Sequence, residues 1–198
     1  MIRFFLLLFG LISYLGFGQN IIPQPESLAF REGTFTLNSE TVIKADENSF
    51  EAQFLQQYIH ENNGLKLAIN KNAKNENCIT LNYALSPKLS ATKDSSGKRS
   101  SYKSNNEEYM LLINKSEITI AAQERAGVFY GIQTLLQLLP LEEKDEIKLP
   151  CLLINDQPKF KWRGMHLDVS RHFFDLEFIK KYIDYLAQYK MNTFHWHL

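Results

Sequence analysis

Cysteine is scarce in this sequence. Only Cys78 and Cys151 occur among its 198 residues, too few for a disulfide framework and too far apart for a C-x-x-C metal or redox pair. At most one bridge can form, and we expect two free, buried thiols instead.

The chain also lacks an excess of charge of either sign. Lysine plus arginine number 22, and aspartate plus glutamate also number 22. Nucleic acids and anionic membranes attract proteins through an excess of basic charge, so this composition argues against both partners. Apolar residues make up 44% of the chain, which is enough for a folded core.

The hydrophobic run near the N-terminus is too short for a membrane anchor. It extends from Phe4 to Leu15, about a dozen residues, whereas a helix that crosses a bilayer needs about 20. Arg3 precedes the run and small residues follow at Gly16 and Gly18, which is the pattern of a signal peptide over residues 1–18. We therefore expect an exported protein, periplasmic or secreted, with no stable membrane anchor.

Residues 19–155 alternate short strand patterns with two helices, which predicts an α+β domain of antiparallel sheet with both helices on one face. Asn48 and Glu51 have the spacing of a capping box, and Gly64 offers a left-handed stop. The segment Ser86–Glu108 has almost no apolar content, which predicts a mobile surface insertion. The expected strands are 34–37, paired antiparallel with 41–45, then 79–83, and finally 109–113, which forms a hairpin with 118–121. The expected helices are 49–63 and 126–139.

A different composition begins after Asp156, where four of the five histidines and 10 of the 25 aromatic residues lie. The segments 165–169 and 193–198 have strand patterns, and Asp175 can cap an amphipathic helix between them. Strand, helix and strand form a βαβ unit, whose strands must be parallel. Parallel sheets are covered on both faces, so we expect the domain that begins at residue 156 to be incomplete.

The strands of this unit are predicted to have one apolar and one ionisable face. His166 and Asp168 alternate with apolar residues in the first strand, as do His195 and His197 in the second. These side chains should face a barrel lumen or cleft, where they could contact substrate or support its rim through hydrogen bonds. His195 and His197 could also ligate zinc, but no third ligand of suitable spacing is visible, so we expect no metal.

Arg171 follows the carboxyl end of the first strand, the edge at which parallel α/β folds bind substrates. Spacing alone favours an arginine at the surface or paired with a carboxylate, which pins the loop, over one that contacts a ligand. The surrounding motifs LDVSRHFF (167–174), IKKYIDYLAQYKMN (179–192) and FHWHL (194–198) resemble glycoside hydrolase family 20, the β-N-acetylhexosaminidases. The resemblance includes Asp156, Trp162 and Arg163, and extends more weakly back through residues 124–140.

The resemblance implies that residues 156–198 open a (β/α)8 catalytic barrel and that residues 19–155 are the family's small domain. It implies that Arg171 binds hydroxyls of a terminal N-acetylglucosamine or N-acetylgalactosamine. It also implies substrate-assisted, retaining hydrolysis of a glycan without a cofactor. The Asp-Glu pair that acts in this reaction would lie beyond residue 198, so the chain itself contains no catalytic residue and should be inactive.

Two other interpretations compete with this one. The chain could be a non-catalytic carbohydrate-binding or interaction module, although its first domain shows no exposed aromatic row with the spacing of a sugar platform. It could also be the N-terminal part of another glycosidase with a similar small domain, such as an α-glucuronidase or a family 84 enzyme. The motifs LDVSRHFF and FHWHL favour family 20 over these.

Overall fold

The computed structural model describes residues 21–83 and 106–198. The expected signal peptide and most of the expected insertion lie outside these residues. The first nine elements are β1 (Ser27–Asn38), β2 (Val42–Lys44), α1 (Phe50–Asn63), β3 (Ala68–Ile69), β4 (Cys78–Asn82), β5 (Tyr109–Ile113), β6 (Glu117–Ala122), α2 (Arg125–Leu138) and β7 (Glu146–Asp156). They are followed by β8 (Gly164–Asp168), α3 (Leu176–Gln188) and β9 (Thr193–His197).

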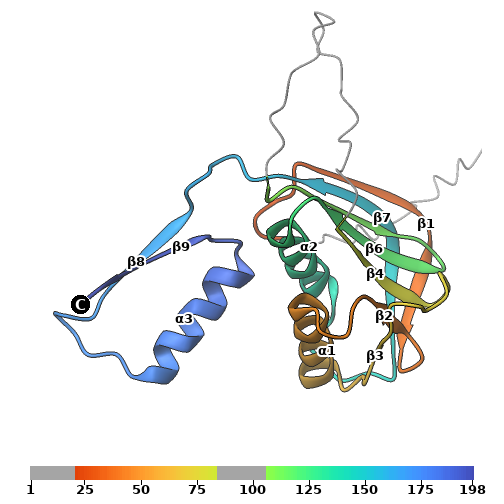
Figure 1. Ribbon diagram of the computed structural model, residues 1–198, viewed down its shortest axis with the longest axis horizontal. Coiled ribbons are helices and arrows are strands. Elements are labelled where there is room, and N and C mark those ends of the chain that lie inside the picture. Colours follow the sequence, from red (N-terminus) through yellow and green to blue (C-terminus); the bar gives the residue numbers. More distant parts are fainter. Residues whose placement is uncertain (1–20, 84–105) are drawn as a thin grey trace, which may run out of the picture.

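The first nine elements form one sheet covered by two helices. The strand order is β1-β7-β5-β6-β4-β2-β3, and α1 and α2 lie on the face that looks toward the β8–α3–β9 unit (Figure 1). The prediction of an antiparallel sheet is wrong, because β4 pairs parallel with both β2 and β6, and β2 pairs parallel with β3. The parallel pairing of β2 with β3 arises because α1 carries the chain from β2 back to the same end of the sheet.

The pairing predicted for residues 34–37 and 41–45 is also wrong. Instead, β1 pairs antiparallel with β7 along nearly its whole length, and β2 lies at the other side of the sheet. No strand was expected at residues 146–156, so the true partner of β1 was missing from the sequence analysis. The hairpin of β5 and β6 is confirmed as antiparallel.

Both helices of this domain lie within one residue of their predicted positions. The side chain of Ser49, rather than Asn48, caps α1 by accepting a hydrogen bond from the backbone N–H of Ala52. Gly64 ends the helix with φ of 76°, the left-handed conformation that was expected. In α2, an added Cβ at Gly131 would lie 2.5 Å from Ile120 Cγ2, so glycine permits the close approach of α2 to β6.

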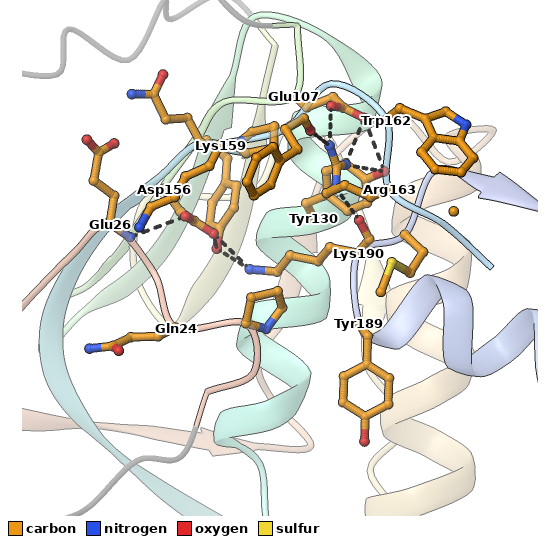
Figure 2. Close-up of a pocket in the computed structure, with 17 residues that line it drawn as sticks. Gln24, Glu26, Glu107, Tyr130, Asp156, Lys159, Trp162, Arg163, Tyr189 and Lys190 are labelled. Atoms are coloured by element: carbon orange, nitrogen blue, oxygen red, sulfur yellow. Dashed lines mark hydrogen bonds and ion pairs between the residues drawn. The ribbon is translucent and has the colours of Figure 1, made fainter.

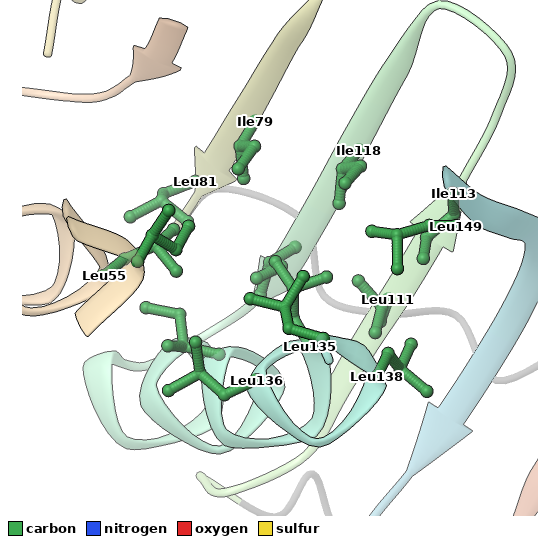
Figure 3. Packing of buried hydrophobic residues seen from close by; sticks show 14 of the residues in the cluster. Leu55, Ile79, Leu81, Leu111, Ile113, Ile118, Leu135, Leu136, Leu138 and Leu149 are labelled. Atoms are coloured by element: carbon green, nitrogen blue, oxygen red, sulfur yellow. The ribbon is translucent and has the colours of Figure 1, made fainter. Parts of the chain in front are cut away.

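The core lies between the sheet and the two helices, as Figure 3 shows. Burying each aliphatic side chain of this kind contributes about 1.5–3 kcal/mol, which makes this layer the main source of stability. Cys78 and Cys151 are buried and unbridged, as expected. The buried side chains include Leu55, Ile79, Leu81, Leu111, Ile113, Ile118, Leu135, Leu136, Leu138 and Leu149.

The second unit has the predicted βαβ form. Strands β8 and β9 pair parallel, and α3 begins at Asp175, whose side chain accepts a hydrogen bond from the N–H of Phe178. Ile179 and Leu186 are the buried residues of α3, whereas Phe178 and Ile183 remain exposed. In the described part of the chain, no helix is long and apolar enough to cross a membrane.

Candidate functional site

The carboxyl ends of β8 and β9 bring together the polar residues that the sequence analysis singled out. Nδ1 of His197 lies 3.2 Å from Oδ1 of Asp168. The hydroxyl of Ser170 donates to the same carboxylate oxygen at 2.8 Å, and the backbone N–H of Arg171 lies 3.3 Å from it. Asp168 therefore organises the loop that follows β8.

Arg171 is exposed in the loop that follows β8. Its side chain is 88% exposed, and its Nε lies 3.5 Å from Oδ2 of Asp168. Hydrogen bonds from Ser170 and His197 hold the pKa of Asp168 below its usual range, so this carboxylate is charged at neutral pH and attracts the guanidinium. An exposed contact of this length is weak, which leaves Arg171 able to donate hydrogen bonds to a ligand.

The histidines share the ionisable face that was predicted for the strand pair. The rings of His166 and His195 have centroids 4.6 Å apart, and the rings of His195 and His197 lie 6.4 Å apart. Within residues 21–83 and 106–198, no group of three or more metal-ligating side chains could hold an ion. Because the three histidines lie on one face, they could support the rim of a ligand-binding site through hydrogen bonds.

A second polar region, which the sequence analysis missed, lines a cavity of about 910 Å³ between the α+β domain and the β8–α3–β9 unit (Figure 2). Lys190 extends from the turn after α3 into the α+β domain. Its Nζ lies 2.9 Å from Oδ2 of Asp156 and 2.7 Å from the hydroxyl of Tyr109, which also hydrogen-bonds to Thr134. The Lys190 side chain is only 7% exposed.

The backbone and the charge of Lys190 are both unusual. Its φ is 58°, in the left-handed region, and the N–H groups of Lys190 and Met191 bond to the carbonyls of Ala187 and Leu186. This is a Schellman ending, in which glycine normally holds the left-handed position. Burial lowers the pKa of Lys190, although the carboxylate of Asp156 opposes the effect.

Within the described part of the α+β domain, a series of aromatic side chains lies along α1. Ring centroids of Phe50 and Phe54 are 6.3 Å apart, and those of Phe54 and Tyr58 are 6.5 Å apart. Phe54 also contacts Phe129 at 5.3 Å and, like Tyr58, packs against the core. Because only Phe50 is well exposed, this series offers no flat platform for a sugar chain.

Family models match both parts of the chain. Residues 18–157 match domain 2 of glycosyl hydrolase family 20, and residues 160–198 match the catalytic domain of that family. A beta-hexosaminidase of Porphyromonas gingivalis is 36% identical over 192 residues, which cover 91% of this chain and 22% of that protein. The chain thus spans under a quarter of the length of this curated relative.

Solved structures agree with the sequence relatives. The exo β-N-acetylglucosaminidase of Vibrio harveyi, determined with N-acetylglucosamine, has a TM-score of 0.71 at 29% identity and covers 91% of this chain and 25% of its own. The N-acetyl-β-hexosaminidase of Streptomyces plicatus also has a TM-score of 0.71, at 31% identity, covering 90% of this chain and 34% of its own. The chain therefore belongs to glycosyl hydrolase family 20.

Proposed function

We propose that this chain is the N-terminal part of an exo-acting β-N-acetylhexosaminidase that releases terminal β-linked N-acetylglucosamine or N-acetylgalactosamine from glycans. The family matches over both parts of the chain are the observation that carries this proposal. The geometry at the carboxyl ends of β8 and β9 supports it, because an exposed guanidinium and a charged carboxylate lie at the edge where such folds bind substrate.

Arg171 is the proposed sugar-binding residue. A planar guanidinium can donate two aligned hydrogen bonds to neighbouring hydroxyls, and the loop that carries it is held by Asp168 and Ser170. Asp168, His195 and His197 are proposed to support the rim of the barrel rather than to react. In this proposal residues 164–198 are the first strands and helix of a (β/α)8 barrel.

The proposed reaction is substrate-assisted and retaining. The oxygen of the sugar's 2-acetamido group attacks the anomeric carbon, a carboxylate stabilises the resulting oxazolinium ring, and a neighbouring carboxylic acid protonates the leaving oxygen. Water then opens the ring and restores the acetamido group. The two acids are assigned to later residues of the longer protein, so the 198-residue chain alone should not catalyse the reaction.

The test compares two proteins and two substrates. The longer protein should hydrolyse nitrophenyl N-acetyl-β-glucosaminide, whereas the 198-residue chain should show no turnover above background. Nitrophenyl β-glucoside lacks the acetamido nucleophile, so the longer protein should leave it nearly intact. Equal hydrolysis of both substrates, or turnover by the 198-residue chain, would contradict the proposal.

Export is a separate proposal that depends on residues 1–18. Arg3 followed by a short apolar run supports a cleaved signal peptide. Expression in the native host followed by N-terminal sequencing should locate the mature start near residue 19, in the periplasm or medium. An intact N-terminus in the cytoplasmic fraction would contradict it.

A further inference from the structure

Glu107 lies two residues before β5 in the α+β domain, and its carboxylate contacts Arg163 at the start of the neighbouring unit (Figure 2). Nη1 and Nη2 of Arg163, the residue before β8, lie 3.0 and 3.1 Å from the two oxygens of Glu107. The side-chain amide of Asn192, the residue before β9, donates to the same carboxylate at 3.2 Å. One side chain thus holds the beginnings of two parallel strands.

The two strand starts are also joined to each other. The backbone N–H of Arg163 donates to the side-chain oxygen of Asn192 at 3.0 Å, and the backbone N–H of Asn192 donates to the carbonyl of Arg163 at 2.9 Å. The Nε of Arg163 donates to the carbonyl of Lys190 at 2.8 Å. Two hydrogen bonds therefore join Arg163 to Asn192, and the Glu107 carboxylate of the α+β domain contacts both side chains.

Burial makes this contact strong and directional. The side chains of Glu107 and Arg163 are 16% and 14% exposed, and the hydroxyl of Tyr130 donates to Glu107 at 3.3 Å. Burial raises the pKa of Glu107, but the hydrogen bonds from Arg163 and Asn192 and the charge of Arg163 outweigh it and hold that pKa below its usual range. A paired, charge-assisted contact fixes both distance and angle.

We infer that Glu107 is a positioning residue that sets the orientation of β8 and β9 on the α+β domain, and thereby the place of Asp168 at the far end of β8 and of Arg171 in the loop that follows. Each strand has five residues, so its far end lies about 15 Å from its start. A tilt of about 5° at the start would move the far end by about 1 Å, a displacement large enough to impair catalysis. The inference rests on the proposed function in one respect only, the identity of the ligand that Arg171 binds.

Amide hydrogen exchange on the 198-residue chain tests this inference with Glu107→Gln. Losing the charge should make the backbone amides of residues 164–168 and 193–197 exchange about tenfold faster, because Glu107 no longer holds the starts of β8 and β9. Residues 117–122 of β6 should keep their protection. Glu107→Asp retains the charge and should give a smaller change, and it replaces Glu107→Gln as the test if that variant fails to fold.

Glu51→Gln is the matched control. The Glu51 side chain is also buried, at 5% exposed, and pairs with the more exposed Arg125 at 2.8 Å, but both residues belong to the α+β domain. Its loss should speed exchange in α1 and α2 and leave β8 and β9 unchanged relative to the rest of the chain. The opposite distribution of effects in the two variants separates positioning from a general loss of stability.

A spectroscopic readout follows the far end of β9 directly. With Trp162→Phe as background, Trp196 is the sole tryptophan of the chain, and its emission should shift with Glu107→Gln but not with Glu51→Gln. Unchanged exchange and emission at β8 and β9, or changes confined to the α+β domain, would overturn the inference. If the exchange and emission change as expected but the unsubstituted longer protein does not hydrolyse the hexosaminide, the proposed function is refuted and the inference about Glu107 stands.

Discussion

Replacing Lys190 by methionine should weaken the contact between the two parts of the chain. Methionine preserves the unbranched stem but removes the ammonium that lies 2.9 Å from Asp156 and 2.7 Å from Tyr109. Removing one partner of a buried ion pair costs about 3–5 kcal/mol. Asp156 keeps hydrogen bonds from Tyr109 and from the N–H of Glu26, so we expect a loss of about 2–3 kcal/mol.

Urea unfolding followed by tryptophan emission measures this loss, because Trp162 and Trp196 both lie in the second unit. Lys180→Met is the control, since Lys180 and Glu177 form an exposed pair at 2.9 Å and such pairs contribute at most about 1 kcal/mol. Lys190→Gly should be about 1 kcal/mol more stable than Lys190→Ala, because glycine relieves the left-handed backbone. Equal effects of Lys190→Met and Lys180→Met would refute the reasoning.

Two further predictions concern acid and thiols. The pKa of Glu107 in the folded chain lies below its value in the unfolded chain. Its stabilising contribution is therefore complete above about pH 4.3 and disappears as the pH falls through the folded pKa. Glu107→Gln should flatten the acid limb of a titration followed by tryptophan emission, and an unchanged limb would contradict this. Cys78 and Cys151 are buried, so both should react with a thiol reagent only in denaturant, and fast labelling of either in buffer would show that the core opens.

The elements that depend on local pattern could be predicted from the sequence. The apolar stripe and Gly64 located α1, and Asp175 located the start of α3. The parallel pairing of β8 and β9 followed from the helix between them. Each of these depends on residues within one or two turns of chain, where periodicity and capping act directly.

Pairing between distant segments could not be predicted in the same way. Strand β1 pairs with β7, more than a hundred residues later, and no local signal connects their sequences. The mixture of parallel and antiparallel pairs could not be predicted for the same reason. It depends on the edge of the sheet to which each connection returns the chain. Tertiary contacts of this kind decide strand neighbours, and local propensity carries little information about them.

The polar contacts between the two parts were also missed, for a related reason. Glu107 belongs to a segment so hydrophilic that it was interpreted as a surface insertion, yet its side chain is largely buried against Arg163. Lys190 follows an amphipathic helix whose polar face looks solvated, and its left-handed φ is invisible in the sequence. Composition shows that a segment is polar, but not which of its charges meets a partner.

Steady-state kinetics of Arg171→Lys in the longer protein is the most direct test of the proposed sugar site, with Arg31→Lys, at an exposed position of β1, as the control. Two charge-assisted hydrogen bonds at about 1.5–3 kcal/mol each predict that kcat/KM falls at least about a hundredfold. The melting temperature should stay unchanged, because Arg171 is exposed. A kcat/KM within a few fold of wild type, or a loss that follows the melting temperature, would contradict the account.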